Sequence, residues 1–161
     1  MRVLITDDVH PILIAKLNSI DYIVDYQPDI SIYEVKLCIE NYDGLIINSK
    51  ILVDREMMDL GSGLKWIGRL GSGLDIIDLN YAKNKHIHIL STPEANCNAV
   101  AEHALGMLIG MLRNIPRANK EVKNMHWLRE KNRGEELSVK KVGIIGCGHT
   151  GSRLAHILGG F

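Results

Sequence analysis

Short apolar runs alternate with helical patterns along the first 90 residues of the chain. Five of these runs have the length and composition of buried strands: Val3–Thr6, Tyr22–Val24, Leu45–Ile47, a run that begins at Trp66–Ile67, and Ile87–Leu90. A helical pattern or a helix-start signal separates each run from the next, so four helices are predicted. Strands that alternate with helices in this way indicate an α/β fold with a doubly wound parallel sheet that carries helices on both faces.

Each predicted helix has its own signal. The first helix begins with Pro11 and has an apolar series spaced for one buried face: Leu13, Ile14, Leu17 and Ile20. The second begins with the capping box Ser31–Glu34 and reaches about Ile39. Asp54 precedes Met57, Met58 and Leu60 in the third, and the fourth has a helical pattern around Leu79–Asn84. Proline near a first turn and a capping box are both typical helix starts.

The pattern changes after residue 93. Asn98 to Asn114 has the pattern of one long helix that ends before Pro116, and Gly106 and Gly110 lie one turn apart on it, which would permit close approach by another helix. Residues 117–141 are polar and are predicted to be helical and then irregular. Trp127 is their one large aromatic side chain, and it either anchors on another subunit or folds back onto the chain's own core.

The last part of the chain contains the pattern G-x-G-x-x-G at Gly146, Gly148 and Gly151. The preceding run Val142–Ile145 has strand character, and 150–158 has helical spacing with Leu154, Ile157 and Leu158 on one side. A motif placed between a strand and a helix is the dinucleotide fingerprint: its glycines permit a tight turn, close approach of a pyrophosphate and packing of helix on strand. The phosphates would meet the N–H groups at the helix start. A tight turn without a ligand is the alternative.

Composition narrows the class of protein. The chain has 161 residues, 46% of them hydrophobic and 24% charged, and a formal net charge of zero, which is typical of a globular domain and gives no sign of a nucleic-acid or membrane partner. The three cysteines are widely spaced and form no C-x-x-C pair, which favours reduced thiols and a cytoplasmic protein. His86 and His88 alternate on a predicted strand without a third ligand, so no metal site is predicted.

Two predicted strand ends carry groups that suit an anionic substrate. In the loop Arg69–Asp75, Gly71 and Gly73 free the backbone to present consecutive N–H groups to a carboxylate or phosphate, and Arg69 adds positive charge. Asn48, Ser49 and Lys50 follow another predicted strand and offer an amide, a hydroxyl and an ammonium group at the same end of the sheet. A plain turn remains the alternative for the Gly-Ser-Gly sequence.

Taken together, the motifs resemble the D-isomer-specific 2-hydroxyacid dehydrogenases, and in particular their D-3-phosphoglycerate dehydrogenase branch. The resemblance rests on four runs in the family's order along the whole chain: Ile67–Asp78, Ser91–Pro93, Asn98–His103 and Gly143–Gly151. It implies a flavodoxin-like substrate domain made from both chain ends, with an NAD-binding Rossmann domain inserted between them.

The resemblance also assigns roles to parts of this chain. Residues 1–96 would be the substrate-binding domain without its C-terminal piece, 97–140 an interdomain helix and dimerisation arm, and 141–161 the opening strand and helix of the Rossmann domain. The backbone at Gly71–Gly73 would hold the substrate carboxylate, with Ser72 near the nicotinamide. His149 and Thr150 would lie at the pyrophosphate of NAD, with NADP left open.

The chain departs from the family pattern in two ways. The family's catalytic arginine, glutamate and histidine fall beyond Phe161, so no catalytic residue is expected here, and the acidic residue that would hold the ribose about 20 positions after the fingerprint is also absent. Asn48 stands where the phosphoglycerate branch usually has arginine, a loss of a bidentate phosphate partner for which Lys50, Arg69 or Arg129 would have to compensate.

The expected function is therefore that of the N-terminal portion of an NAD-dependent D-2-hydroxyacid dehydrogenase, similar to phosphoglycerate dehydrogenase, which oxidises a D-2-hydroxy acid to a 2-oxo acid by hydride transfer. One alternative is a substrate of the glyoxylate or hydroxypyruvate type. The other is a non-catalytic fragment that forms a homodimer or binds a partner through residues 97–140.

Overall fold

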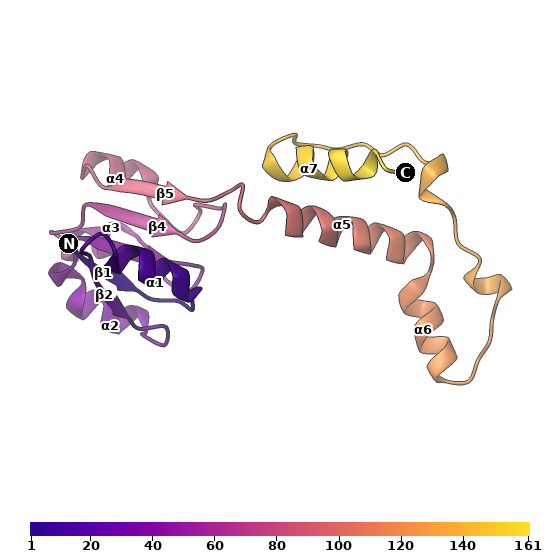
Figure 1. The fold of residues 1–161 in the computed structure, drawn as a ribbon, viewed down its shortest axis with the longest axis horizontal. Helices are drawn as coiled ribbons and strands as arrows, with labels where there is room; N and C mark the ends of the chain where they lie inside the picture. Colours follow the sequence, from indigo (N-terminus) through magenta and orange to yellow (C-terminus); the bar gives the residue numbers. More distant parts are fainter. The chain divides into compact units, whose positions relative to one another are not determined.

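The computed structural model describes all 161 residues and divides them into two compact units, Met1–Pro93 and Glu94–Phe161. The first unit contains a five-stranded sheet, drawn in indigo to pink in Figure 1. Its strands are β1 (Arg2–Ile5), β2 (Ile23–Tyr26), β3 (Gly44–Ile47), β4 (Trp66–Arg69) and β5 (His88–Ser91). All pairings are parallel, in the order β2-β1-β3-β4-β5, which confirms the predicted doubly wound sheet.

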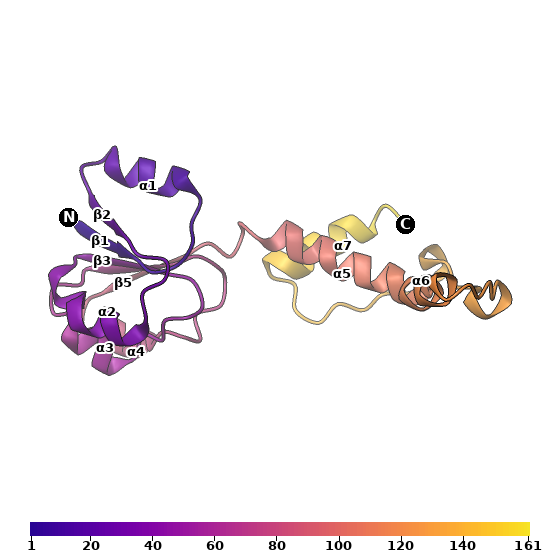
Figure 2. The same ribbon diagram turned by 90° about the horizontal axis from the view of Figure 1, so that it is seen from below.

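Helices cover the two faces of this sheet unequally (Figure 2). One face carries α2 (Ile32–Cys38), α3 (Arg55–Leu60) and α4 (Leu79–Asn84), and the other carries only α1 (Pro11–Asn18). Along β3, Leu45 and Ile47 join the large core beneath α2–α4, whereas Ile46 joins the smaller core beneath α1. This alternation is what a strand buried on both faces requires.

The helix-start signals work as the sequence indicates. The Asp54 carboxylate accepts the Met57 N–H at 2.9 Å, and Ser31 and Glu34 form the reciprocal capping box, so α3 and α2 begin where predicted. The buried face of α1 is shorter than predicted. Leu13, Ile14 and Leu17 pack against the small core, but α1 ends at Asn18 and Ile20 is 59% exposed beyond it.

The second unit is mainly helical. It contains α5 (Cys97–Leu112), α6 (Ile115–Lys123), α7 (His149–Leu158) and two short 3-10 turns at Glu130–Asn132 and Leu137–Val139; a further 3-10 turn in the first unit, Ile39–Asn41, extends α2. The long predicted helix is confirmed as α5. Pro116, however, lies in the first turn of α6, which follows a left-handed residue at Asn114, so it starts a second helix as well as ending the first. No helix is both long and apolar enough to cross a bilayer.

The predicted strand Val142–Ile145 does not form. The segment makes no strand pairing, and Ile145 is fully exposed. A strand is held by hydrogen bonds to a neighbouring strand, and the second unit has no other strand to supply them. The helix predicted after it is present as α7, which packs along α5 with Leu154, Ile157 and Leu158 half-buried.

Candidate functional site

The carboxyl ends of the parallel strands bring two predicted substrate segments together in the first unit. In the strand order β2-β1-β3, β2 lies next to β1 on one side and β3 lies next to it on the other, so the strand order reverses between β1 and β3. Ligands of such sheets bind at this topological switch point. Ile47, Arg69 and Ser91 are in register, and the Leu70 N–H donates to the Ile47 carbonyl at 2.9 Å. The segments 48–50 and 69–73 therefore begin side by side.

The turn after β4 has a shape that requires glycine. Gly71 has φ +151°, in the region that favours glycine, and a Cβ there would lie 1.5 Å from Arg69 Nη1. The Gly71 N–H donates back to the Arg69 carbonyl at 3.0 Å, whereas no hydrogen bond within the chain engages the N–H groups of Ser72 and Gly73. Two consecutive free donors at a strand end are suited to receive a carboxylate.

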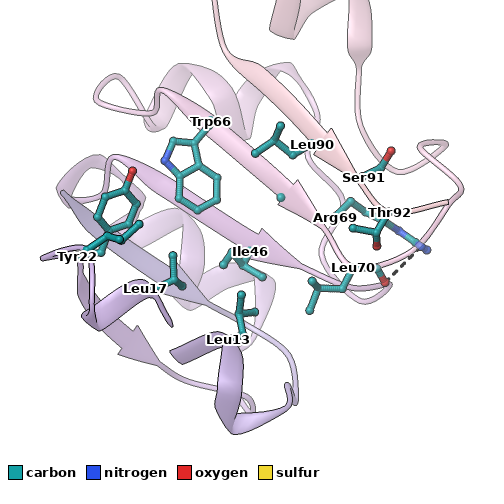
Figure 3. A pocket seen from close by; sticks show the side chains of 12 residues that line it. Leu13, Leu17, Tyr22, Ile46, Trp66, Arg69, Leu70, Leu90, Ser91 and Thr92 are labelled. Atoms are coloured by element: carbon teal, nitrogen blue, oxygen red, sulfur yellow. Dashed lines mark hydrogen bonds between the residues drawn. The ribbon is translucent and has the colours of Figure 1, made fainter. Parts of the chain in front are cut away.

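The guanidinium of Arg69 folds over this turn (Figure 3). Its Nη1 makes only a long contact of 3.5 Å with the Leu70 carbonyl, and its Nε is buried without any hydrogen-bond partner. Buried donors in proteins nearly always have an acceptor, so an unpartnered guanidinium nitrogen makes Arg69 a candidate for anion binding. The carboxylate of Asp75 lies near Gly73.

The other predicted substrate cation is already engaged. Lys50 Nζ donates to the carbonyl of Pro28, in the loop after β2. Ser49 is exposed and Asn48 is half-buried at the end of β3. The segment 48–50 thus lies beside the 69–73 turn, but its ammonium group points to the chain's own backbone.

Sequence reasoning missed Asp7, which fixes the start of this segment. Its Oδ2 accepts the Asn48 N–H at 2.8 Å and the Thr6 hydroxyl at 3.0 Å. Thr6 is the one fully buried polar residue, and its N–H donates to the Ile46 carbonyl at 3.1 Å. Asp7 follows a fully buried strand at the switch point, and that position was the available signal.

Beside α1 the sheet face is hollowed, with a volume of about 380 Å³ (Figure 3). The lining is mostly apolar, with Leu17 from α1, Ile46 from β3 and Leu90 from β5, while Tyr22 and Trp66 face each other at 6.4 Å between ring centroids. Arg69, Ser91 and Thr92 bring polar groups at the carboxyl end. Most of the hollow is therefore apolar, and the groups that could contact a hydroxy acid lie at its carboxyl end.

The fingerprint turn in the second unit has the mechanical features that its glycines predict. Gly146 adopts φ +91°, a conformation that favours glycine. A Cβ on Gly151 would lie 2.0 Å from the Gly146 carbonyl oxygen, so the turn and the helix approach each other closely only because residue 151 is glycine. Gly148 caps α7 without a side-chain hydrogen bond and has open space around it. His149 and Thr150 are exposed at the helix start.

Metal chemistry has no visible ligand set. No group of three or more His, Cys, Asp or Glu side chains gathers in a way that could hold an ion. His86 lies in a turn with φ 58°, not on a strand, so it does not alternate with His88 as predicted. Both histidines are exposed on the surface.

A family model described as the D-isomer specific 2-hydroxyacid dehydrogenase catalytic domain matches residues 3–155, which is nearly the whole chain. The chain belongs to this family. A D-3-phosphoglycerate dehydrogenase from Synechocystis is 36% identical over 156 residues, which is 97% of this chain and 28% of the relative. A hydroxypyruvate reductase from Thermotoga maritima is 38% identical over 122 residues, which is 76% of this chain and 40% of that protein.

The chain also shares its fold with solved structures. An acyclic imino acid reductase in complex with NADPH and D-Arg superposes with a TM-score of 0.87 at 25% identity, over 99% of this chain and 53% of that one. The chain thus spans about a quarter to a half of the length of the relatives that it matches. The family and the fold predicted from the motifs are confirmed, whereas the roles of the individual site residues stay predictions.

Proposed function

We propose that the chain is the N-terminal portion of an NAD-dependent D-2-hydroxyacid dehydrogenase that oxidises a D-2-hydroxy acid to a 2-oxo acid. The observation that carries this proposal is the 69–73 turn, where two free backbone N–H groups lie beside an arginine whose buried Nε has no partner. A 2-hydroxy acid has the one group that such a turn needs, a carboxylate.

In this proposal the substrate carboxylate accepts the N–H groups of Ser72 and Gly73 and pairs with the Arg69 guanidinium. Asp7 and Asn48 hold the neighbouring strand end in place, which limits the positions open to the rest of the substrate. Pinning the carboxylate fixes the orientation of the hydroxyl-bearing carbon, and orientation is a large part of enzymatic rate enhancement.

NAD is the proposed cofactor, with NADP as the alternative. The fit rests on Gly146, whose positive φ favours glycine, on Gly151, where a Cβ would meet the Gly146 carbonyl oxygen, and on the uncapped start of α7. Gly148, His149 and Thr150 would hold the pyrophosphate there. When bound, the nicotinamide supplies the hydride acceptor. The residues of this chain bind and orient; the proton-transfer groups of the reaction are proposed to lie in other parts of the longer enzyme.

One observation favours a substrate without a phosphate group. Lys50 is tied to the Pro28 carbonyl, and Asn48 occupies the position where a bidentate arginine would be expected for phosphoglycerate. Arg69 is then the remaining cation beside the turn, and the proposed carboxylate uses it. We therefore propose glyoxylate, hydroxypyruvate or the corresponding hydroxy acids as substrates ahead of 3-phosphoglycerate.

Residues 97–140 are proposed to form a homodimer interface. Trp127 is 79% exposed and Met125 is 92% exposed, and a groove of about 210 Å³ beside them is lined by Val122 and Leu128. Contiguous exposed apolar surface of this kind marks an interaction site in soluble proteins. Dimerisation without catalysis is the second candidate function for the chain by itself, and sedimentation of the chain and of Trp127→Ala separates a dimer from a monomer.

The substrate proposal is tested by adding D-glycerate and D-3-phosphoglycerate to the chain and following backbone amide shifts by NMR. The amides of Ser72 and Gly73 should shift, and those of Ser62 and Gly63, in a second Gly-Ser-Gly sequence, should not. Arg69→Gln should weaken binding about tenfold or more, as expected for a charged hydrogen bond, whereas Lys65→Gln should leave it unchanged. Binding of D-3-phosphoglycerate tenfold tighter than D-glycerate would contradict the unphosphorylated substrate; unmoved Ser72 and Gly73 amides would contradict the site.

A further inference from the structure

Two side-chain polar atoms in the whole structure are buried without a hydrogen-bond partner, Arg69 Nε and Arg153 Nε. Arg69 belongs to the proposed substrate turn. Arg153 lies on α7, outside the G-x-G-x-x-G residues, and the proposed function gives it no role. A buried guanidinium nitrogen without an acceptor is costly, so Arg153 calls for an explanation of its own.

Arg153 faces an open hollow of about 540 Å³ within the second unit. Its lining comes from the first residue of α5 and from the start and one face of α7: Cys97, Gly148, His149, Ser152, Arg153 and His156. His149, Arg153 and His156 are spaced i, i+4 and i+7, so they share one face of the helix. Side chains on a helix lean toward its N-terminus, which directs the Arg153 side chain toward the fingerprint turn.

The starts of α5 and α7 have no side-chain caps. The N-cap residues, Asn96 for α5 and Gly148 for α7, make no side-chain cap hydrogen bond, and neither helix has an acidic residue in its first turn. Because Cys97 and Gly148 line the same hollow, both helix starts present free N–H groups and partial positive charge there. A cationic side chain with a free donor and two uncapped helix starts all favour one kind of occupant, a phosphate anion.

We propose that Arg153 is a phosphate-binding residue, which donates from its guanidinium to the pyrophosphate that the hollow between the starts of α5 and α7 receives. The proposal rests on the proposed dinucleotide function, because that function makes a pyrophosphate the expected occupant. It widens the predicted site in two respects: it adds a side-chain cation four residues beyond His149, and it gives the start of α5 a part in holding the anion. The planar fork of arginine matches a phosphate better than an ammonium group does.

The test uses the 161-residue chain with inorganic pyrophosphate and with NADH as separate probes, and calorimetry to measure Kd at several salt concentrations. Arg153→Gln should weaken the binding of both probes about tenfold or more and reduce the dependence of Kd on salt. Arg113→Gln is the matched control, because it removes the same charge from an exposed arginine of the same unit and should change Kd less than twofold. Arg153→Lys should restore part of the affinity. Thermal melting and amide spectra of each variant separate a binding effect from a folding defect.

The outcomes distinguish the residue from the function. If Arg153→Gln and Arg113→Gln weaken binding equally, the proposed role of Arg153 is wrong, although binding at the fingerprint stands. If the chain binds pyrophosphate through Arg153 but does not bind NADH, the phosphate site stands and the dinucleotide function fails for this chain. If neither probe binds at millimolar concentration, the phosphate site itself is overturned.

Discussion

The pentapeptide Leu-Gly-Ser-Gly-Leu occurs twice, at residues 60–64 before β4 and at 70–74 after it, and the two copies have different structures. In the first, the Gly61 N–H donates to the Met57 carbonyl and closes the end of α3 with an ordinary φ of −82°, and Leu64 is buried. In the second, Gly71 takes φ +151° and the following N–H groups are free.

The amino and carboxyl ends of the parallel strands also differ in how completely their polar groups are paired. At the amino-end edge, the carboxylate of Asp43 accepts the Arg2 N–H at 2.8 Å and Lys65 Nζ at 2.6 Å, so its charges are paired. At the carboxyl-end edge, Arg69 Nε has no partner. Polar groups that are paired within the chain contribute to stability, and polar groups that are unpaired are available to a ligand. Identical sequence thus closes a helix before β4 and leaves two backbone N–H groups free after it.

The largest expected effect comes from placing the same methyl group in each copy. In Gly71→Ala the new Cβ falls on the Arg69 guanidinium at a strained φ, so binding of D-glycerate should fall below detection and stability should drop by about 1–3 kcal/mol. In Gly61→Ala the Cβ lies 2.6 Å from Leu64 Cδ1, and overpacking should cost about 1–3 kcal/mol without changing the affinity. Urea unfolding and NMR titration measure the two quantities, and a loss of binding in Gly61→Ala would end the distinction between the copies.

A second pair of variants compares the edges through two carboxylates that each accept a backbone N–H at 2.8 Å, Asp7 from Asn48 and Asp43 from Arg2. Alanine at either position leaves that N–H without its partner, so both variants should be less stable. Only Asp7→Ala should weaken D-glycerate binding, by several-fold, because it releases the segment beside the substrate turn. Asp7→Asn keeps an acceptor oxygen and should restore most of the affinity. Equal affinities in all three variants would show that Asp7 stabilises the fold alone.

The smallest effect is the response of the amino-end edge to acid. The hydrogen bond from Tyr42 lowers the pKa of Asp25 from its ordinary 3.8; partial burial opposes this shift, and the ion pair with Arg2 adds to it. The hydrogen bond from the Lys65 ammonium lowers the pKa of Asp43. A folded-state pKa below the unfolded value gives stability that is present above the unfolded pKa and lost as pH falls through the folded pKa. Melting temperatures should therefore begin to fall below about pH 4. The fall should be shallower in Asp25→Asn than in the unmodified chain, and identical slopes would exclude Asp25 as a contributor.

Much of the first unit follows from short-range patterns in the sequence. Apolar runs with a strand's length and caps such as Asp54 and Ser31–Glu34 locate its strands and helices to within a few residues, because capping and alternation act over one or two turns of chain. The order of motifs also led to the correct family. The glycines of the fingerprint were assigned their turn and close-packing roles from spacing, and Gly146 and Gly151 have the corresponding geometry.

Tertiary structure decided what depends on distant partners. Val142–Ile145 has a strand's composition but no strand in its unit to pair with, so the pattern does not produce a strand. The partners of Asp7 and Lys50, and the absence of partners for Arg69 and Arg153, depend on residues brought close only by folding. The two Leu-Gly-Ser-Gly-Leu copies make the limit plain. Their local preferences are identical, and the difference between a helix end and a turn with free N–H groups comes from which neighbours use each copy's hydrogen-bonding groups and fill the space around its glycines.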